Sequence, residues 1–150
     1  MRVKEHIAVS AVFSGGILMI TRSWVMFIVS FLSGVLVDID HVVDYLRQHP
    51  ASYDIVHFFK TCEEYRLKRV YLWFHSIEFL ALIGVVTYLT RSICLMGFML
   101  GLAQHLAFDI IFNRGFSWTY FLVFRWKHGF RGEKVFDIPV EFRERQIGED

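Results

Sequence analysis

Residues 37–44 have the sequence Val37-Asp38-Ile39-Asp40-His41-Val42-Val43-Asp44 and directly follow an apolar run that extends from Trp24 to Val37. Asp38, Asp40 and His41 therefore stand at the end of a hydrocarbon-like segment, where ionisable groups are costly unless a partner compensates them. Carboxylate oxygens and imidazole nitrogens at this density are ligands that divalent metals take in proteins. A solvated helix end is the simpler interpretation, so the choice depends on whether other segments bring matching ligands to the same level.

The composition of the 150-residue chain indicates one small, strongly apolar domain. Hydrophobic residues make up 55% of the chain, which exceeds their usual share in soluble domains. The formal net charge is only +1, which gives no bulk attraction for nucleic acid, so no nucleic-acid partner is expected. Cys62 and Cys94 are isolated from one another and form neither a zinc knuckle nor a disulfide framework.

Four apolar segments predict an all-α integral membrane bundle, with helices at about residues 5–21, 24–41, 70–90 and 93–112. The last two segments each contain about 20 predominantly apolar residues, the length that a full membrane span requires. The first two have only about 14 residues of near-continuous apolarity, so full spanning and embedding from one side both stay open. We expect residues 1–150 to form a single membrane-embedded domain.

The remaining segments are too polar to span a membrane. An amphipathic pattern predicts an interfacial helix at about residues 53–68, with charged residues on its wet face. Residues 113–150 are predicted to form a short cytoplasmic tail. Within that tail we expect a short aromatic helix at Phe116–Phe124 and an extended segment at Val135–Phe142.

The distribution of basic residues predicts the orientation of the bundle. Of the 16 Lys and Arg residues, 14 fall on the side shared by the N-terminus, the loop of residues 38–70 and the tail. The opposite turns contain only Arg22 and Arg91. Cytoplasmic loops carry the excess of Lys and Arg, so we expect a multi-pass protein of the inner (plasma) membrane with both termini in the cytoplasm.

This topology brings ionisable residues from all four predicted helices to one level near the cytoplasmic interface. His75 would lie one turn inside the third helix, with Glu78 one turn further along the same face. His105 and Asp109 share a face of the fourth helix because they are four residues apart. The predicted metal ligands are His6, Asp38, Asp40, His41, His75, His105 and Asp109.

The ligand types favour zinc, with manganese or another divalent ion as the alternative, and one to three ions. Asp40 or Asp38 would be the bridging carboxylate if two ions are present. We assign catalytic roles to Glu78, as a general base or supporting residue, and to Asp40. Weaker candidates for binding an anionic headgroup or for a peripheral role are Arg47, His57, Arg114 and Lys127.

These motifs resemble a family of small bacterial and archaeal inner-membrane proteins described as membrane-bound, metal-dependent hydrolases. The resemblance rests on His6, on the stretch Leu36–His41, on Phe74–Ser76 and on the pair His105 and Asp109, and it covers nearly the whole chain. Many relatives have H-R-G-x-T-H-S where this chain has V-Y-L-W-F-H-S, so Val70 replaces the first histidine. The family is distantly similar to zinc-dependent phospholipase C and nuclease folds, which implies phosphoester chemistry.

The expected function is therefore hydrolysis of a phosphoester in a lipid-like or amphipathic substrate by metal-activated water, with the lipid bilayer as the main partner. A non-catalytic membrane protein, whose His/Asp cluster only binds metal or hydrogen-bonds to hold the bundle, is the principal alternative. A metal or proton transporter is a third possibility. It is disfavoured because the ionisable residues gather at one end of the predicted helices.

Overall fold

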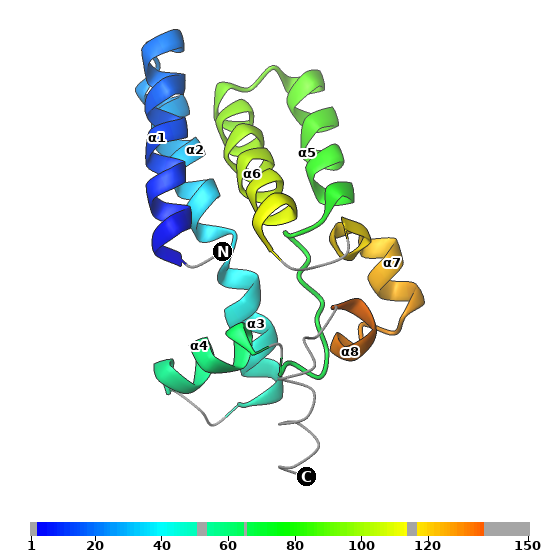
Figure 1. Cartoon of the computed structure of the whole chain (residues 1–150). Helices are drawn as coiled ribbons and strands as arrows, with labels where there is room; N and C mark the ends of the chain where they lie inside the picture. The colour runs from blue at the N-terminus through cyan, green and yellow to red at the C-terminus, as the bar shows by residue number, and fades with distance from the viewer. Residues whose placement is uncertain (1–2, 51–53, 65, 114–116, 137–150) are drawn as a thin grey trace. The chain divides into compact units, whose positions relative to one another are not determined.

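The computed structural model describes residues 3–50, 54–64, 66–113 and 117–136 (Figure 1). Every regular element in these ranges is a helix, as the sequence predicts. The elements are α1 (Val3–Thr21), α2 (Trp24–Leu36), α3 (Ile39–Gln48), α4 (Ile55–Glu63), α5 (Ile77–Thr90), α6 (Ile93–Phe112), the 3₁₀ helix η1 (Ser117–Tyr120), α7 (Leu122–Lys127) and α8 (Gly132–Val135).

The chain divides into two compact units. Unit 1 comprises residues 1–38 and 74–113 and contains α1, α2, α5 and α6. Unit 2 comprises residues 39–73 and 114–150 and contains the shorter helices. The expectation of one membrane-embedded domain stays a prediction, and each unit is described by itself below.

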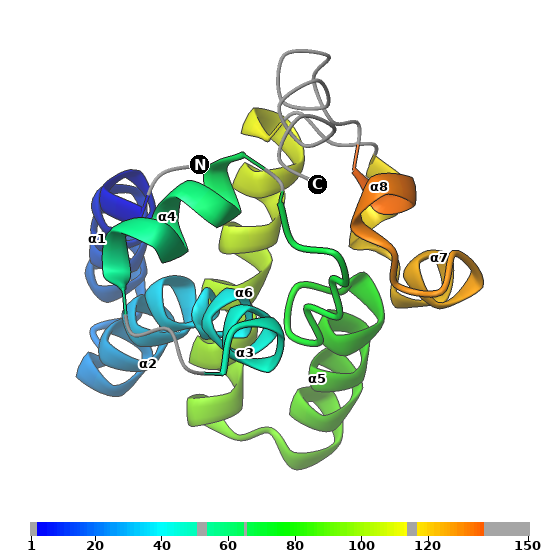
Figure 2. The ribbon, with the colours of Figure 1, turned by 90° about the horizontal axis from the view of Figure 1, so that it is seen from below.

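Helix α6 is the central element of unit 1, because it contacts α1, α2 and α5 (Figures 1 and 2). Its closest neighbour is α2, and the contact is made possible by Gly97 and Gly101. A Cβ atom at Gly97 would lie 3.1 Å from the Met26 carbonyl oxygen, and one at Gly101 would overlap the Ser30 carbonyl oxygen. This small-xxx-small spacing lets two helix backbones approach closely.

The interior of unit 1 contains many polar side chains beside a few apolar ones such as Leu102 and Leu106. Ser10 donates a hydrogen bond to Gln104 Oε1 over 3.1 Å, and Ser30 donates one to Ser14 Oγ over 2.8 Å. All four of these side chains are buried. Several large apolar side chains of α1 are exposed instead; Val12 and Met19, for example, are 78% and 77% exposed.

Unit 2 has a conventional apolar core. Its buried members are Tyr45, Leu67, Val70 and Leu72, against which Phe58, Cys62 and Phe136 pack. Hydrogen bonds also connect segments of this unit. The Gln48 side chain donates to the Arg69 carbonyl oxygen and accepts from the Arg69 amide, and the Thr119 hydroxyl donates to the Val135 carbonyl oxygen. Because Val70 belongs to this core, an apolar residue there has a packing role within unit 2.

The predicted third helix is wrong at its start. It begins at Ile77 rather than near residue 70, after an irregular segment. The Tyr71 and Leu72 amides donate to the Asp44 carboxylate at 2.6 and 3.1 Å, and Leu72 has a φ of 44°, which an α-helix cannot accommodate. The Ser76 hydroxyl then accepts from the Phe79 amide and caps the helix.

Other boundaries also differ from the predictions. The second predicted helix is divided, because a turn at Val37 and Asp38 separates α2 from α3. The interfacial helix is shorter than residues 53–68 and begins after Asp54, whose carboxylate accepts the Val56 and His57 amides. The predicted tail contains η1, α7 and α8, and most of the expected extended segment lies outside the described residues.

Two stretches of the described residues are long and apolar enough to cross a membrane. They are Trp24–Gln48, which covers α2 and α3, and Ile93–Phe112, which is α6. Helix α5 is apolar but shorter. Of the four expected spans, two therefore meet this criterion of length and composition.

Candidate metal centre

Four segments of unit 1 supply side chains to one buried cluster. His6 lies in the first turns of α1, and Asp38 follows the end of α2. His75 immediately precedes the N-cap residue of α5, while His105 and Asp109 are one turn apart on α6. The prediction that these five residues meet is confirmed by their contacts. The prediction that His75 lies inside a helix is wrong, because the helix begins two residues later.

The contacts among four side-chain atoms of the cluster fall near the ligand spacing of a tetrahedral metal site. His75 Nε2 lies 3.2 Å from Asp38 Oδ1 and 3.1 Å from His105 Nε2. His105 Nε2 lies 3.4 Å from both Asp38 Oδ1 and Asp109 Oδ2, and His75 Nε2 lies 3.9 Å from Asp109 Oδ2. Ligands about 2.0–2.1 Å from a tetrahedral zinc ion are separated from one another by about 3.3 Å.

The hydrogen bond of His105 Nδ1 determines which nitrogen of this ring carries the proton. His105 Nδ1 lies 2.7 Å from the Gly34 carbonyl oxygen and donates its proton there. In the neutral imidazole, Nε2 then presents a lone pair to the other three atoms. This is the arrangement in which metal-ligating histidines are held by an outer hydrogen bond.

The side chains of the cluster differ in their exposure. His75, His105 and Asp109 are almost fully buried, with side-chain exposures of 2%, 0% and 5%. The Asp38 side chain is 24% exposed and follows a helix end rather than lying within a helix. Asp38 is therefore the member of the cluster that solvent reaches most easily.

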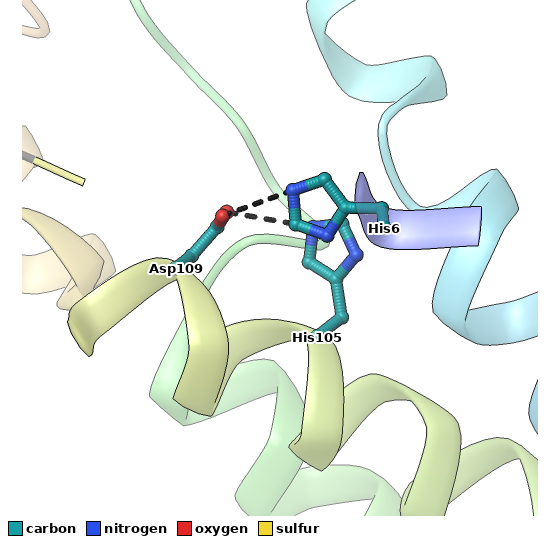
Figure 3. A group of neighbouring side chains, drawn as sticks. All are labelled: His6, His105 and Asp109. Atoms are coloured by element: carbon teal, nitrogen blue, oxygen red, sulfur yellow. Dashed lines mark ion pairs between the residues drawn. The ribbon is translucent and has the colours of Figure 1, made fainter. Parts of the chain in front are cut away.

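His6 adds a further imidazole beside Asp109 (Figure 3). His6 Nε2 lies 3.2 Å from Asp109 Oδ1, and the His6 ring stacks on the His105 ring with centroids 4.1 Å apart. Ligand atoms of His6, His105 and Asp109 all fall within 4.8 Å of one another, so these three residues could also hold an ion. Asp109 thus directs its two oxygens towards different histidines.

The same distances are also those of ion pairs between protonated histidines and carboxylates. One proton on His105 Nε2 would satisfy only one of the two carboxylates that face it. A single divalent cation would satisfy all four converging atoms and balance the two carboxylate charges. The donor set of two histidines and two aspartates suits such an ion.

The helix contact between α2 and α6 positions the cluster. Gly34 brings its carbonyl oxygen within reach of His105, and a Cβ at Gly34 would lie 2.6 Å from the Ser10 hydroxyl oxygen. Gly101 stands one turn before His105 and sets the approach of the two backbones. Close packing therefore determines where the imidazole lies.

The other predicted site residues include two in unit 2 and one on α5 of unit 1. Asp40 is buried and His41 is half-buried, both in the first turn of α3 in unit 2, and their assignment as ligands stays a prediction. Glu78 is half-buried in the first turn of α5. Because His75 precedes the helix, the expected shared helix face with Glu78 does not apply, and the catalytic role of Glu78 stays a prediction.

The weaker substrate-binding candidates that the structure describes lie in unit 2, where two of them contact other side chains. Arg47 is exposed, lies 3.6 Å from the Asp44 carboxylate and covers the Tyr71 ring. His57 Nδ1 lies 2.7 Å from the Tyr45 hydroxyl oxygen within unit 2. Lys127 is exposed at the end of α7, and Arg114 lies outside the described residues.

Some residues that shape the site are absent from the sequence-based prediction. They are Gly34, whose carbonyl oxygen holds His105, and the pair Ser10 and Gln104, which stands directly beside it. Spacing gives a partial signal for them: Ser10 follows His6 by one turn, and Gln104 precedes His105 by one residue. The backbone role of Gly34 leaves no comparable pattern.

No protein-family model matches the chain, and neither a curated protein nor a solved structure matches it. The arguments about function below therefore rest on the residues and their geometry, with the family resemblance as an expectation.

Proposed function

We propose that the chain is a membrane-embedded, metal-dependent hydrolase that cleaves a phosphoester in a lipid-like or amphipathic substrate. The observation that carries this proposal is the convergence of Asp38 Oδ1, His75 Nε2, His105 Nε2 and Asp109 Oδ2 at 3.1–3.9 Å. Zinc is the ion we propose, held by these four side chains, since it accepts nitrogen and oxygen ligands in tetrahedral geometry.

The donor set favours catalysis over a purely structural site. Structural zinc sites are built mainly from cysteines, whereas catalytic sites use histidines and carboxylates. When bound, a divalent ion lowers the pKa of water and polarises phosphoryl oxygens. Asp38 is the most exposed of the four residues, so it is the ligand best placed to yield its position to an incoming group.

The exposed apolar surface of unit 1 supports a location in the membrane. Only 33% of the apolar window in Trp24–Gln48 and 39% of that in Ile93–Phe112 is buried, whereas a core helix of a soluble protein would be mostly buried. Exposed apolar side chains also cover α1, where Ile20 is 85% exposed. Soluble monomers rarely expose such extended apolar surface. We propose four membrane-embedded helices in the inner membrane, with both termini in the cytoplasm.

An apolar hollow supports a substrate with a hydrocarbon portion. It has a volume of about 380 Å³ and is lined by residues of α1 and α6 alone: Ala8, Val9, Val12, Phe13 and Phe108. These two helices also carry His6, His105 and Asp109. A lipid phosphate is therefore favoured over a soluble nucleotide.

The proposal is tested by measuring zinc content and hydrolysis with the full chain purified in detergent and returned to phospholipid vesicles. We expect about one or more zinc ions per chain, release of phosphate or headgroup from lipid phosphates, and loss of both in His105→Ala. His128→Ala is the matched control, because His128 lies at the end of α7 in unit 2. Full activity of metal-free protein, or of His105→Ala, would contradict the proposal.

The ion-pair contacts favour a second candidate, in which the cluster only holds the helices of unit 1 together. In that case a chelator either leaves the unfolding temperature unchanged, as for pure ion pairs, or lowers it without any turnover being found. Zinc content and turnover, measured on the same preparations, distinguish the two candidates.

A further inference from the structure

One nitrogen of the cluster has no role in the four-atom centre. His6 is only 2% exposed, and its Nδ1 atom is buried without a hydrogen-bond partner among the described residues. Leaving a buried polar atom unsatisfied costs about 1–3 kcal/mol. An atom of this kind beside a candidate metal centre marks a position where a group of a bound ligand would be accommodated.

The surroundings of His6 indicate which nitrogen carries the proton. Nε2 lies 3.2 Å from Asp109 Oδ1, which is an ion-pair distance rather than an observed hydrogen bond, and a carboxylate can only accept hydrogen bonds. A proton on Nε2 of the neutral ring would therefore suit Asp109, and it would leave the unpartnered Nδ1 as an acceptor. The group that satisfies Nδ1 must be a donor, such as a water molecule or a substrate hydroxyl.

His6 contacts two of the four side chains of the centre, His105 and Asp109. Its ring stacks on His105 at 4.1 Å with an interplanar angle of 15° (Figure 3). Its nearest contact in the cluster is Asp109 Oδ1, whereas Asp109 Oδ2 faces His75 and His105. Carboxylate ligands are commonly held by hydrogen bonds from outside the coordination shell.

We infer that His6 is a positioning residue outside the metal's coordination shell: Nε2 holds Asp109 in place, and Nδ1 accepts a hydrogen bond from a water or substrate hydroxyl that enters the site. The inference differs from the expectation that His6 is a ligand, which stays a prediction, and it rests on the proposed metal centre. His6 would thus contact the metal ligand Asp109 through one nitrogen and the incoming water or hydroxyl through the other.

The test compares His6→Gln, His6→Ala and His105→Ala in the full-length protein, with zinc affinity measured by competition with a chromogenic chelator. The glutamine amide replaces the Nε2 proton but offers no acceptor where Nδ1 stands. We expect His6→Gln to bind zinc within about threefold of wild type and His6→Ala to bind it about 10- to 100-fold more weakly. His105→Ala should bind no stoichiometric zinc.

Zinc-saturated His6→Gln should also turn over lipid phosphate about tenfold more slowly, the effect of one lost hydrogen bond of about 1.4 kcal/mol. Loss of a zinc equivalent in His6→Gln would overturn the inference, because His6 would then be a ligand. Wild-type affinity in His6→Ala, or full turnover in His6→Gln, would overturn it as well. Zinc affinities in the expected order without turnover in wild type would support the positioning role while refuting the proposed hydrolase.

Discussion

The two units of this chain have different interiors. Unit 1 buries serine, glutamine, histidine and aspartate side chains beside a few apolar ones, and it exposes many of its other valine, isoleucine and methionine side chains. Unit 2 packs Tyr45, Leu67, Val70 and Leu72 into an apolar cluster. One sequence therefore combines two ways of holding helices together.

The difference agrees with the surroundings that we propose, which are lipid for unit 1 and water for unit 2. Water drives apolar side chains inwards, whereas lipid gives no such drive, so helices in lipid associate through close packing and interhelical hydrogen bonds. Gly97 and Gly101 supply close packing in unit 1, and the Ser14–Ser30 pair supplies a hydrogen bond.

The largest expected effect comes from closing the space between α2 and α6. In Gly101→Ala the new Cβ would overlap the Ser30 carbonyl oxygen and the Ser33 hydroxyl oxygen. Overpacking against backbone costs about 1–3 kcal/mol and more in severe cases, so we expect a loss of about 3 kcal/mol or more and reduced zinc content. Thermal unfolding in detergent measures this. Gly16→Ala, whose Cβ meets nothing within 4 Å, is the control and should be neutral or slightly stabilising.

A charged substitution on the outer face of unit 1 tests whether lipid or water surrounds this face. Val12 is 78% exposed on α1, where a lysine would be harmless in water but costs about 2.5 kcal/mol at the centre of a membrane helix. We expect Val12→Lys to reduce the membrane-inserted fraction of the chain, measured by carbonate extraction. Ile55→Lys, at a 70% exposed position of α4 in unit 2, should be inserted normally. Equal insertion of both variants would remove the proposed distinction between the units.

The smallest effects come from single truncations inside each unit. Val70→Ala removes methyl groups from the fully buried core of unit 2 and should cost about 1–2 kcal/mol. Ser14→Ala removes one hydrogen bond from unit 1, and such bonds between membrane helices average about 0.6 kcal/mol. Denaturant titration followed by tryptophan fluorescence compares the two variants. A Ser14→Ala loss that exceeds the Val70→Ala loss would reverse the expected order.

The sequence predicts the helical class and most of the candidate cluster, because both depend on local patterns. Apolar runs located α1, α2, α5 and α6, and the i, i+4 spacing placed His105 beside Asp109. The start of α5 could not be predicted in this way. It depends on Asp44, which is far from residues 71 and 72 in the sequence but accepts their amides.

The polar contacts between the helices of unit 1 could be predicted only in part from the sequence. The small residues of α1 indicated close packing, but which serines would pair, and that Gly34 would hold His105 through a carbonyl oxygen, depends on the register between helices. Register is set by contacts such as that at Gly101, which no single segment encodes. The local pattern identified the residues of the cluster, and the helix contacts determined their geometry.

The spread of the cluster along the chain has a consequence for assembly. Asp38 follows α2, and Asp109 lies in the last turn of α6, the final helix of unit 1. A growing chain therefore cannot present the full set of proposed donors until α6 has been synthesised and docked against α2. Ion capture would then act as a late checkpoint, so that metal content reports the fraction of chains whose helices have all reached their places.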